Sequence, residues 1–280
     1  MRLASFNVLH GRSLADGQVS TERLVAACAS LEADVLALQE IDRNQARSGG
    51  VDQTAAVAEG MGAQAWRFEP ALIGEPGATW RAAEEGDHVA GQAGGRDHVA
   101  GQAGGRDHDP ASADAGYGVG LVSKLPVRAW HVVRLRAAKV RAPVAVPGGR
   151  GRFILLPDEP RVALAAEVDT DWGPVVGAST HLSFVPGWNL AQVRRVTRAL
   201  AAIGPPCVLL GDLNFPGGLP ARVTGWRPLA EVRTFPGAKP SMQIDHALGH
   251  GLLPPVAAAE ARELPLSDHR ALVIDLGPGV

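Results

Sequence analysis

The sequence predicts an α/β fold, a four-layer sandwich in which two mixed β-sheets pack face to face and helices flank them. Short apolar runs typical of strands recur along the 280 residues, whereas only three segments have helical periodicity. Because so few helices separate the strands, a regular strand–helix alternation is excluded and two packed sheets are favoured. The hydrophobic fraction of 46% allows a substantial core.

The N-terminal part of the chain is predicted to contain two strands and two helices. Residues 3–8 and 34–40 are apolar runs typical of strands, and the second run ends on the carboxylate of Glu40. Ser20 can cap a helix whose apolar residues follow at helical spacing. Residues 53–61 predict a second short helix.

A low-complexity insert interrupts the chain between about residues 74 and 115. The ten residues 87–96 are repeated in residues 97–106, and a third copy begins at Asp107. Gly, Ala and Gln dominate the repeat and cannot bury a core, so we expect a disordered surface insert. Residues 1–280 are otherwise interpreted as one domain.

Strands dominate again after the insert. Residues 117–123 and 127–135 are predicted to form a strand pair, and a Pro-, Gly- and Arg-rich loop follows at about 141–151. The segment 188–203 has the apolar stripe of an amphipathic helix. Further strands are predicted at residues 152–156, 161–168, 174–180, 207–210, 243–248 and 271–276.

The composition argues against several classes of protein. With 27 basic and 29 acidic residues, the chain has no general basic field for holding a long polyanion. Cys28 and Cys207 lie in apolar runs, which predicts buried free thiols rather than a disulfide framework. No signal peptide or membrane-spanning run is evident, so we expect a soluble cytoplasmic protein without a stable protein partner.

Polar side chains of catalytic type follow many of the predicted strands. A single Asp after a strand usually forms a turn, but so many such positions are hard to explain by turn chemistry. Strand ends converge at one edge of a sheet, where sites are usually built. The set comprises Asn7, Glu40, His181, Asp212, Asn214, Asp245, His246, Asp268 and His269.

These residue types favour phosphate chemistry with a hard divalent cation. Carboxylate oxygens suit Mg²⁺ or Mn²⁺, and Glu40 and Asp268 are the best metal candidates, with Asn7 as a neutral ligand. Zinc is disfavoured because no dense His and Cys set occurs. The sequence also lacks a Gly-x-Ser-x-Gly nucleophile elbow and a Gly-x-x-x-x-Gly-Lys-Ser/Thr phosphate loop.

Six short motifs resemble the endonuclease/exonuclease/phosphatase superfamily, which has the DNase I-like fold. Each motif is weak alone, but together they occur in the family's order and cover nearly the whole chain outside the insert. The motifs are SFNV at Ser5, LQE at Leu38, THL at Thr180, GDLN at Gly211, IDH at Ile244 and SDH at Ser267.

The resemblance implies roles for the metal-binding and water-activating residues. Glu40 and Asp268 would bind the metal with help from Asn7. Asp212 would orient or deprotonate the attacking water, and Asn214 would hold the phosphate in register.

The resemblance also implies that His181 and His269 flank the scissile phosphate. In one assignment His269 assists the water and His181 protonates the leaving oxygen; in another both stabilise charge and Asp212 is the base. Asp245 would accept a hydrogen bond from His269 and fix its tautomer. Tyr117 is a candidate for substrate contact at the rim of the cleft, or for packing.

The predicted function is a divalent-metal-dependent phosphodiesterase or phosphatase that acts by in-line attack of water. His181 stands where the family's abasic-site endonucleases usually carry Tyr, which favours the DNase, sphingomyelinase and phosphatase branch. The aromatic content of 5% offers few platforms for stacking bases. A small or lipid-derived phosphoester is therefore favoured over duplex DNA.

Two alternatives remain open. An endo- or exonuclease acting on DNA or RNA is supported by a basic run that could hold a strand. An inactive phosphate-binding module would lack an acidic residue or a histidine of the set, and none is missing. The basic run comprises Arg134, Arg136, Lys139, Arg141, Arg150 and Arg152.

Overall fold

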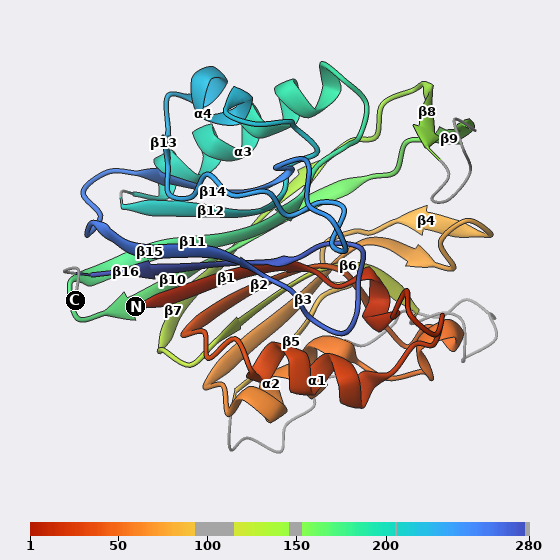
Figure 1. Cartoon of the computed structure of the whole chain (residues 1–280), viewed down its shortest axis with the longest axis horizontal. Helices are drawn as coiled ribbons and strands as arrows, with labels where there is room; N and C mark the ends of the chain where they lie inside the picture. Colours follow the sequence, from red (N-terminus) through yellow and green to blue (C-terminus); the bar gives the residue numbers. More distant parts are fainter. Residues whose placement is uncertain (93–114, 146–152, 205, 278–280) are drawn as a thin grey trace.

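The computed structural model describes residues 1–92, 115–145, 153–204 and 206–277. In these residues two mixed β-sheets pack face to face and helices cover both outer faces, as the sequence predicts (Figure 1). No helix in the described ranges is long and apolar enough to cross a membrane.

The first sheet joins the N-terminal strands to the last two strands of the chain. Its strands are β1 (Arg2–Asn7), β2 (Val35–Arg43), β3 (Ala65–Gly74), β4 (Trp80–Ala82), β5 (Val89–Gln92), β6 (Gly116–Ser123), β15 (Val256–Arg262) and β16 (Ala271–Leu276). Their order is β15-β16-β1-β2-β6-β3-β4, with β5 also paired to β3. Only β1 and β2 are parallel neighbours among the described strands of this sheet.

The second sheet is built from the middle of the chain. Its strands are β7 (Val127–Leu135), β10 (Arg161–Thr170), β11 (Gly173–His181), β12 (Cys207–Asp212), β13 (Arg227–Pro228) and β14 (Asp245–His250). Their order is β13-β14-β12-β11-β10-β7, with β11 and β12 parallel. The strands β8 (Arg141–Ala145) and β9 (Phe153–Pro157) form a separate two-stranded ribbon.

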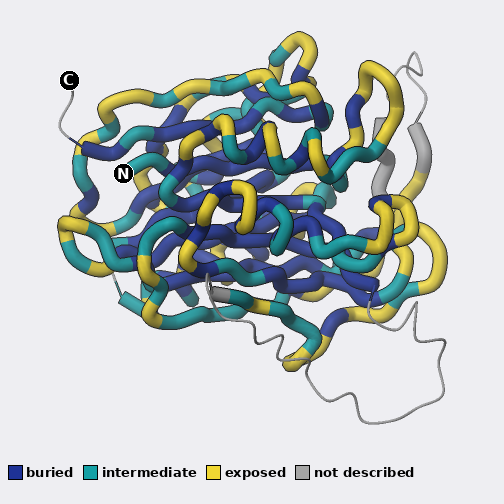
Figure 2. The backbone as a smooth tube through the Cα atoms, turned by 90° about the horizontal axis from the view of Figure 1, so that it is seen from below, coloured by how far each residue is buried: buried dark blue, intermediate teal, exposed yellow. Residues whose placement is uncertain are grey.

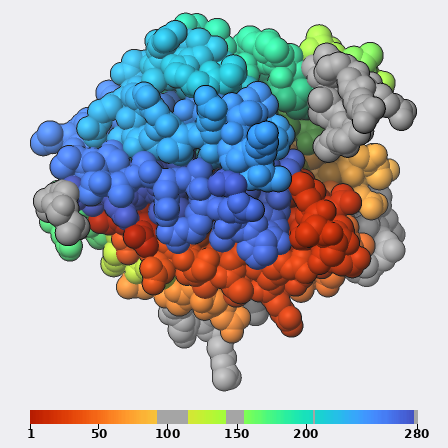
Figure 3. All heavy atoms as spheres, viewed as in Figure 1, coloured from red at the N-terminus to blue at the C-terminus, as the bar shows by residue number. Residues whose placement is uncertain are grey.

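Helices cover the outer face of each sheet (Figure 1). They are α1 (Thr21–Ala29) and α2 (Gln53–Met61) on the first sheet, and α3 (Trp188–Ile203) and α4 (Leu219–Thr224) on the second. Ser20 caps α1 as predicted, since its side chain accepts a hydrogen bond from the backbone N–H of Arg23 at 3.1 Å. In the space-filling view, the blue C-terminal segments form a band between the red N-terminal layer and the cyan layer (Figure 3).

The apolar core follows these layers and forms three clusters of buried side chains. Leu121 and Leu164 belong to the cluster between the two sheets. Phe6 packs in the cluster beneath α1 and α2, and Leu200 and Leu209 pack in the cluster beneath α3 and α4. The buried strands at the centre of the molecule show this arrangement (Figure 2). Each sheet is therefore buried on both faces, as the near-continuous apolar runs predict.

The predicted strand pair of residues 117–123 and 127–135 is wrong. β6 pairs with β2 and β3 in the first sheet, whereas β7 pairs with β10 in the second. The short link between them carries the chain from one sheet to the other. Ser123 closes this link locally, because its hydroxyl donates to Leu125 O and accepts from Leu125 N. The turn residues therefore resemble those of a hairpin although no hairpin forms.

Two segments expected to lack regular structure contain strands. Residues 80–92, within the expected insert, form β4 and β5, and residues 141–145 form β8. The backbone hydrogen bonds of an open strand edge can pair a segment whatever its side chains. The rest of the insert, residues 93–114, and residues 146–152 of the expected loop lie outside the described residues.

Three further strands, β3, β13 and β15, are not predicted from the sequence. β15 carries four alanines within seven residues, a composition that favours helix by propensity. It pairs with β16 at one end of the sheet, so tertiary context decides its conformation.

Candidate active site

Five of the predicted site residues lie at one end of the two sheets because of strand direction. Asn7 ends β1, and Glu40 lies near the end of the parallel strand β2. His181 ends β11 and Asp212 ends the parallel β12, where the two residues are register partners. Asp245 begins the antiparallel strand β14 directly opposite Asp212. The two sheets each supply one half of the cluster.

Unusual backbone conformations orient several of these side chains. Glu40 is the extra residue of a β-bulge in β2 and has a φ of 54°. Asn214 has a φ of 52° two residues after the end of β12, and Ser267 has a φ of 70° directly before Asp268. Left-handed backbone is disfavoured for Glu and Ser and is tolerated better by Asn, and such strain concentrates at functional sites.

Gly211 shows how closely the backbones approach beneath the site. Its φ is 149°, and a Cβ at this position would lie 1.9 Å from the backbone oxygen of Thr180. Only glycine therefore allows β12 to run beside β11 and deliver the next residue, Asp212, next to His181.

Asn7 connects carboxylates from the two halves of the site. Its Nδ2 donates to Glu40 Oε1 at 3.0 Å and to Asp212 Oδ2 at 3.2 Å. Its Oδ1 accepts from the backbone N–H of Leu9 at 3.2 Å. Ser267 anchors the loop before Asp268, because its hydroxyl donates to Asn7 O at 2.6 Å. Asp268 Oδ1 lies 3.9 Å from His269 Nε2, so it borders the same cluster.

His269 and Asp245 form a buried pair. His269 Nδ1 lies 2.8 Å from Asp245 Oδ2, which also accepts a hydrogen bond from the Thr234 hydroxyl. The ring of Phe235 packs against the imidazole with centroids 4.8 Å apart. His269 Nε2 faces the site and lies 3.8 Å from Asp212 Oδ2. The pairing that the resemblance implied for Asp245 and His269 is present in this geometry.

His181 is held by an arginine that the sequence analysis does not single out. Arg161 Nη1 lies 3.2 Å from His181 Nδ1, and a guanidinium can only donate, so Nδ1 accepts. The ring proton of neutral His181 is then on Nε2, which lies 3.5 Å from Asp212 Oδ2. Asn214 Nδ2 is 3.2 Å from the same Nε2 and donates to Leu182 O at 2.9 Å.

Burial and charge give the titratable groups different protonation states. Burial raises the pKa of Asp212 to about 7, despite the opposing charge of His269. Burial alone would lower the pKa of His269, but the charge and hydrogen bond of Asp245 outweigh it and raise this pKa to about 10. Burial and the Arg161 charge lower the pKa of His181 well below its ordinary value. Burial also raises the pKa of Glu40.

Two overlapping groups of side chains could hold a cation. Asp212, Asp245 and His269 offer ligand atoms that lie within 4.8 Å of one another. Of the predicted ligands, Asn7 donates both to the same Asp212 and to Glu40, so its amide links the two carboxylates. Carboxylate and amide oxygens in this arrangement suit a hard divalent ion.

Tyr117 lies in a small pocket beside His181 rather than at an exposed rim. Its ring is 9% exposed, and Arg47 stacks over it with the guanidinium carbon 5.4 Å from the ring centroid. Arg161 and Thr234 were not predicted as site residues. Arg161 could have been noticed in the sequence because it places a charge at the first position of an apolar strand. Thr234 could not, because it lies in a loop without a recognisable motif.

The family model for the endonuclease/exonuclease/phosphatase family matches residues 4–269. The chain belongs to this family. The predictions of family and of fold are therefore confirmed, and the ordered motifs carried both. Members of the family hydrolyse phosphoesters.

Solved structures share the fold along almost the whole chain. The endonuclease/exonuclease/phosphatase from Beutenbergia cavernae DSM 12333 aligns with a TM-score of 0.63 and 20% identity, over 100% of this chain and 72% of that chain. The mannosyl-6-phosphatase from Bacteroides thetaiotaomicron VPI-5482 has a TM-score of 0.55 and 15% identity, over 99% of each chain. Sphingomyelinase C from Streptomyces griseocarneus has a TM-score of 0.55 and 14% identity, over 99% of each chain. No curated protein sequence matches significantly.

Proposed function

We propose that this protein is a divalent-metal-dependent phosphoester hydrolase that acts by in-line attack of water on phosphorus. The observation that carries the proposal is the contact between buried Asp212, the His269–Asp245 pair and the Asn7–Glu40 pair in one cluster. Hydrolysis of a phosphoester needs a base for water, positive charge for the phosphoryl oxygens and a donor for the leaving oxygen. Each need has a candidate among these side chains.

The donor set fits a hard divalent cation. Asn7 Nδ2 lies between the carboxylates of Glu40 and Asp212, and rotation of the amide, which would break the hydrogen bond from Leu9 N–H to Oδ1, would present its oxygen in the same place. We infer that Glu40 and Asp268 hold Mg²⁺ or Mn²⁺ with the help of Asn7. When bound, the ion would neutralise charge on the phosphoryl oxygens.

The protonation states favour one assignment of proton transfer. Asp212, whose pKa is about 7, accepts the proton of the attacking water. His269, whose pKa is about 10, is an imidazolium and offers positive charge to the phosphoryl group. Neutral His181 carries its ring proton on Nε2 and offers it to the substrate, and Asn214 would hold the phosphate in register beside it.

Two similar structures bear on the substrate. One is named as a mannosyl-6-phosphatase and the other as a sphingomyelinase C, so the fold serves both a monoester and a lipid diester. The nuclease alternative is weakened by Arg134, whose guanidinium binds Glu69 Oε1 at 2.7 Å within the protein. We therefore keep a phosphatase or phosphodiesterase as the proposed activity.

Hydrolysis of p-nitrophenyl phosphate and bis(p-nitrophenyl) phosphate, with Mg²⁺, Mn²⁺ or EDTA, tests this function. We expect metal-dependent release of nitrophenolate that falls by about 10³-fold in His269→Ala. His250→Ala is the matched control, because His250 stacks on Trp226 with centroids 5.1 Å apart and has no described contact with the cluster. Full activity in His269→Ala or in EDTA would refute the assignment. Failure to cleave either ester, plasmid DNA or phospholipid would favour the phosphate-binding module.

A further inference from the structure

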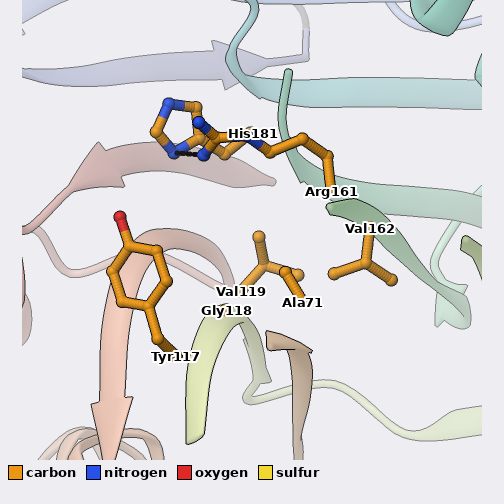
Figure 4. A pocket seen from close by; sticks show the side chains of 7 residues that line it. All are labelled: Ala71, Tyr117, Gly118, Val119, Arg161, Val162 and His181. Atoms are coloured by element: carbon orange, nitrogen blue, oxygen red, sulfur yellow. Dashed lines mark hydrogen bonds between the residues drawn. The ribbon is translucent and has the colours of Figure 1, made fainter. Parts of the chain in front are cut away.

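A small pocket lies beside His181, at the junction of the two sheets. Tyr117 and Val119 of β6 line it from the first sheet, and Arg161 and Val162 of β10 line it from the second. The Tyr117 hydroxyl points toward His181 and the Arg161 guanidinium across the pocket (Figure 4). The space is sufficient for about one water-sized group.

Arg161 is a buried cation with few partners. The residue is 7% exposed, and its only hydrogen bond to a described residue is to His181 Nδ1. Its Nε is buried without a partner in the described chain. Glu159 Oε2 lies 4.0 Å from Nη2, which is too long for a hydrogen bond. A guanidinium has five N–H donors, so most of its capacity to bind an anion is unused.

We propose that Arg161 and the Tyr117 hydroxyl bind one charged, non-bridging oxygen of the substrate's phosphoryl group, which makes the enzyme selective for phosphomonoesters. This inference rests on the proposed function and narrows its substrate class. The phosphoryl group of a monoester has a second pKa of about 6, so it is mainly a dianion at neutral pH. A diester has only one negative charge, which its two non-bridging oxygens share.

The preference for a monoester comes from charge, because a diester also has unsubstituted oxygens that the pocket could hold. The buried guanidinium interacts more strongly with a dianion than with a monoanion, because the pocket is shielded from water. The volume admits a single oxygen. The residues opposite one another, a cation and a phenol, are both hydrogen-bond donors to such an oxygen.

A simpler role for Arg161 would be to balance the nearby carboxylates or to hold the His181 ring. Glu159 and Glu40 both lie near enough for such balancing. Loss of the guanidinium would then impair every ester in the same proportion, since neither role depends on the charge of the substrate. Comparison of two esters therefore separates the two roles.

The test is steady-state kinetics of Arg161→Met with p-nitrophenyl phosphate and bis(p-nitrophenyl) phosphate in Mg²⁺. We expect kcat/KM for the monoester to fall by about 100-fold, as when an oxyanion-binding donor is removed, and for the diester by about 5-fold or less. Arg161→Lys should recover part of the monoester activity. Arg194→Met, which changes an exposed arginine of α3, is the control. Equal losses on both esters would overturn the proposal.

A second readout does not depend on turnover. Inorganic phosphate, a dianion in part at neutral pH, should raise the thermal unfolding midpoint of the wild type more than dimethyl phosphate does. This preference should disappear in Arg161→Met and weaken in Tyr117→Phe, which preserves the ring if the arginine variant fails to fold. If the wild type cleaves no ester but still prefers phosphate through Arg161, the proposed function fails while the pocket stands. Equal stabilisation by the two ions in the wild type would refute the pocket.

Discussion

The positive charge of His269 depends on the carboxylates around it. Burial opposes its positive charge, but Asp245 at 2.8 Å and the nearby Asp212 and Asp268 outweigh burial and raise the pKa to about 10. The same environment raises the pKa of Asp212 to about 7. At neutral pH the site therefore combines a stable imidazolium with a carboxylate that can readily take up a proton.

Replacement of Asp245 by Asn should lower the pKa of His269 from about 10 to its ordinary value of 6.5 or below, because burial then acts with less opposition. Ring ¹⁵N chemical shifts of the metal-free protein measure this change. The wild-type ring should be protonated at about pH 8 and the variant ring neutral. A protonated ring in both proteins would show that Asp245 does not set the charge.

The same pair should affect stability at alkaline pH. Since the pKa of His269 is raised in the folded state, its stabilisation is complete below about 6.5 and is lost as pH rises through about 10. Urea unfolding in EDTA measures the free energy of unfolding at about pH 8 and at about pH 10. Between these two pH values, this free energy should fall more for the wild type than for Asp245→Asn. Identical losses would contradict the assignment.

At the scale of the element, the bulge in β2 places the carboxylate of Glu40 in the site and strains the backbone at that residue. Glu40 has no partner in β6 and lies in the left-handed region, whereas its neighbours Gln39 and Ile41 pair normally. Without the extra residue, each side chain that follows Glu40 in β2 would lie on the other face of the sheet from the one it now occupies. The strain is therefore associated with the metal-binding role proposed for Glu40.

Glu40→Gly should be more stable than Glu40→Ala by about 1 kcal/mol, because only glycine adopts a φ near 54° without strain. Both variants lose the carboxylate, so both should lose metal-dependent activity. The difference between the unfolding free energies of the two variants, measured by urea denaturation, gives the contribution of backbone strain at this position. If the two variants had equal stability, the bulge would not be strained.

At the scale of the whole molecule, the site depends on how the two sheets are aligned. Beneath it, Gln39 of β2 donates to Ser179 of β11 at 3.2 Å, and the Ser179 hydroxyl donates to Leu38 O at 3.0 Å. All three groups are buried. These directional hydrogen bonds therefore fix the position of one sheet relative to the other, which apolar contacts alone would not do. Ser5 of β1 donates to the same Gln39 from within the first sheet.

Ser179→Ala should destabilise the protein by about 1–3 kcal/mol, because it leaves the buried Gln39 amide without its partner across the sheets. It should also lower kcat, since the halves of the site would lose their alignment. Ser5→Ala removes a comparable bond within one sheet and should affect stability but not kcat. Chemical denaturation compares the stabilities of the Ser179→Ala and Ser5→Ala variants, and kinetics with p-nitrophenyl esters compares their kcat values. A similar kcat in both variants would argue against the aligning role.

The sequence by itself determined the family, the layered fold and the identity of most clustered residues. These residues were predictable because short motifs and the ends of apolar runs are local features of the sequence; they are Asn7, Glu40, His181, Asp212, Asp245 and His269. The tertiary structure alone decided which strands pair, as β6 and β7 show by entering different sheets. It also revealed Arg161 and Thr234, whose partners are distant in sequence. Pairing across sheets and burial of charge depend on long-range packing, which local patterns do not encode.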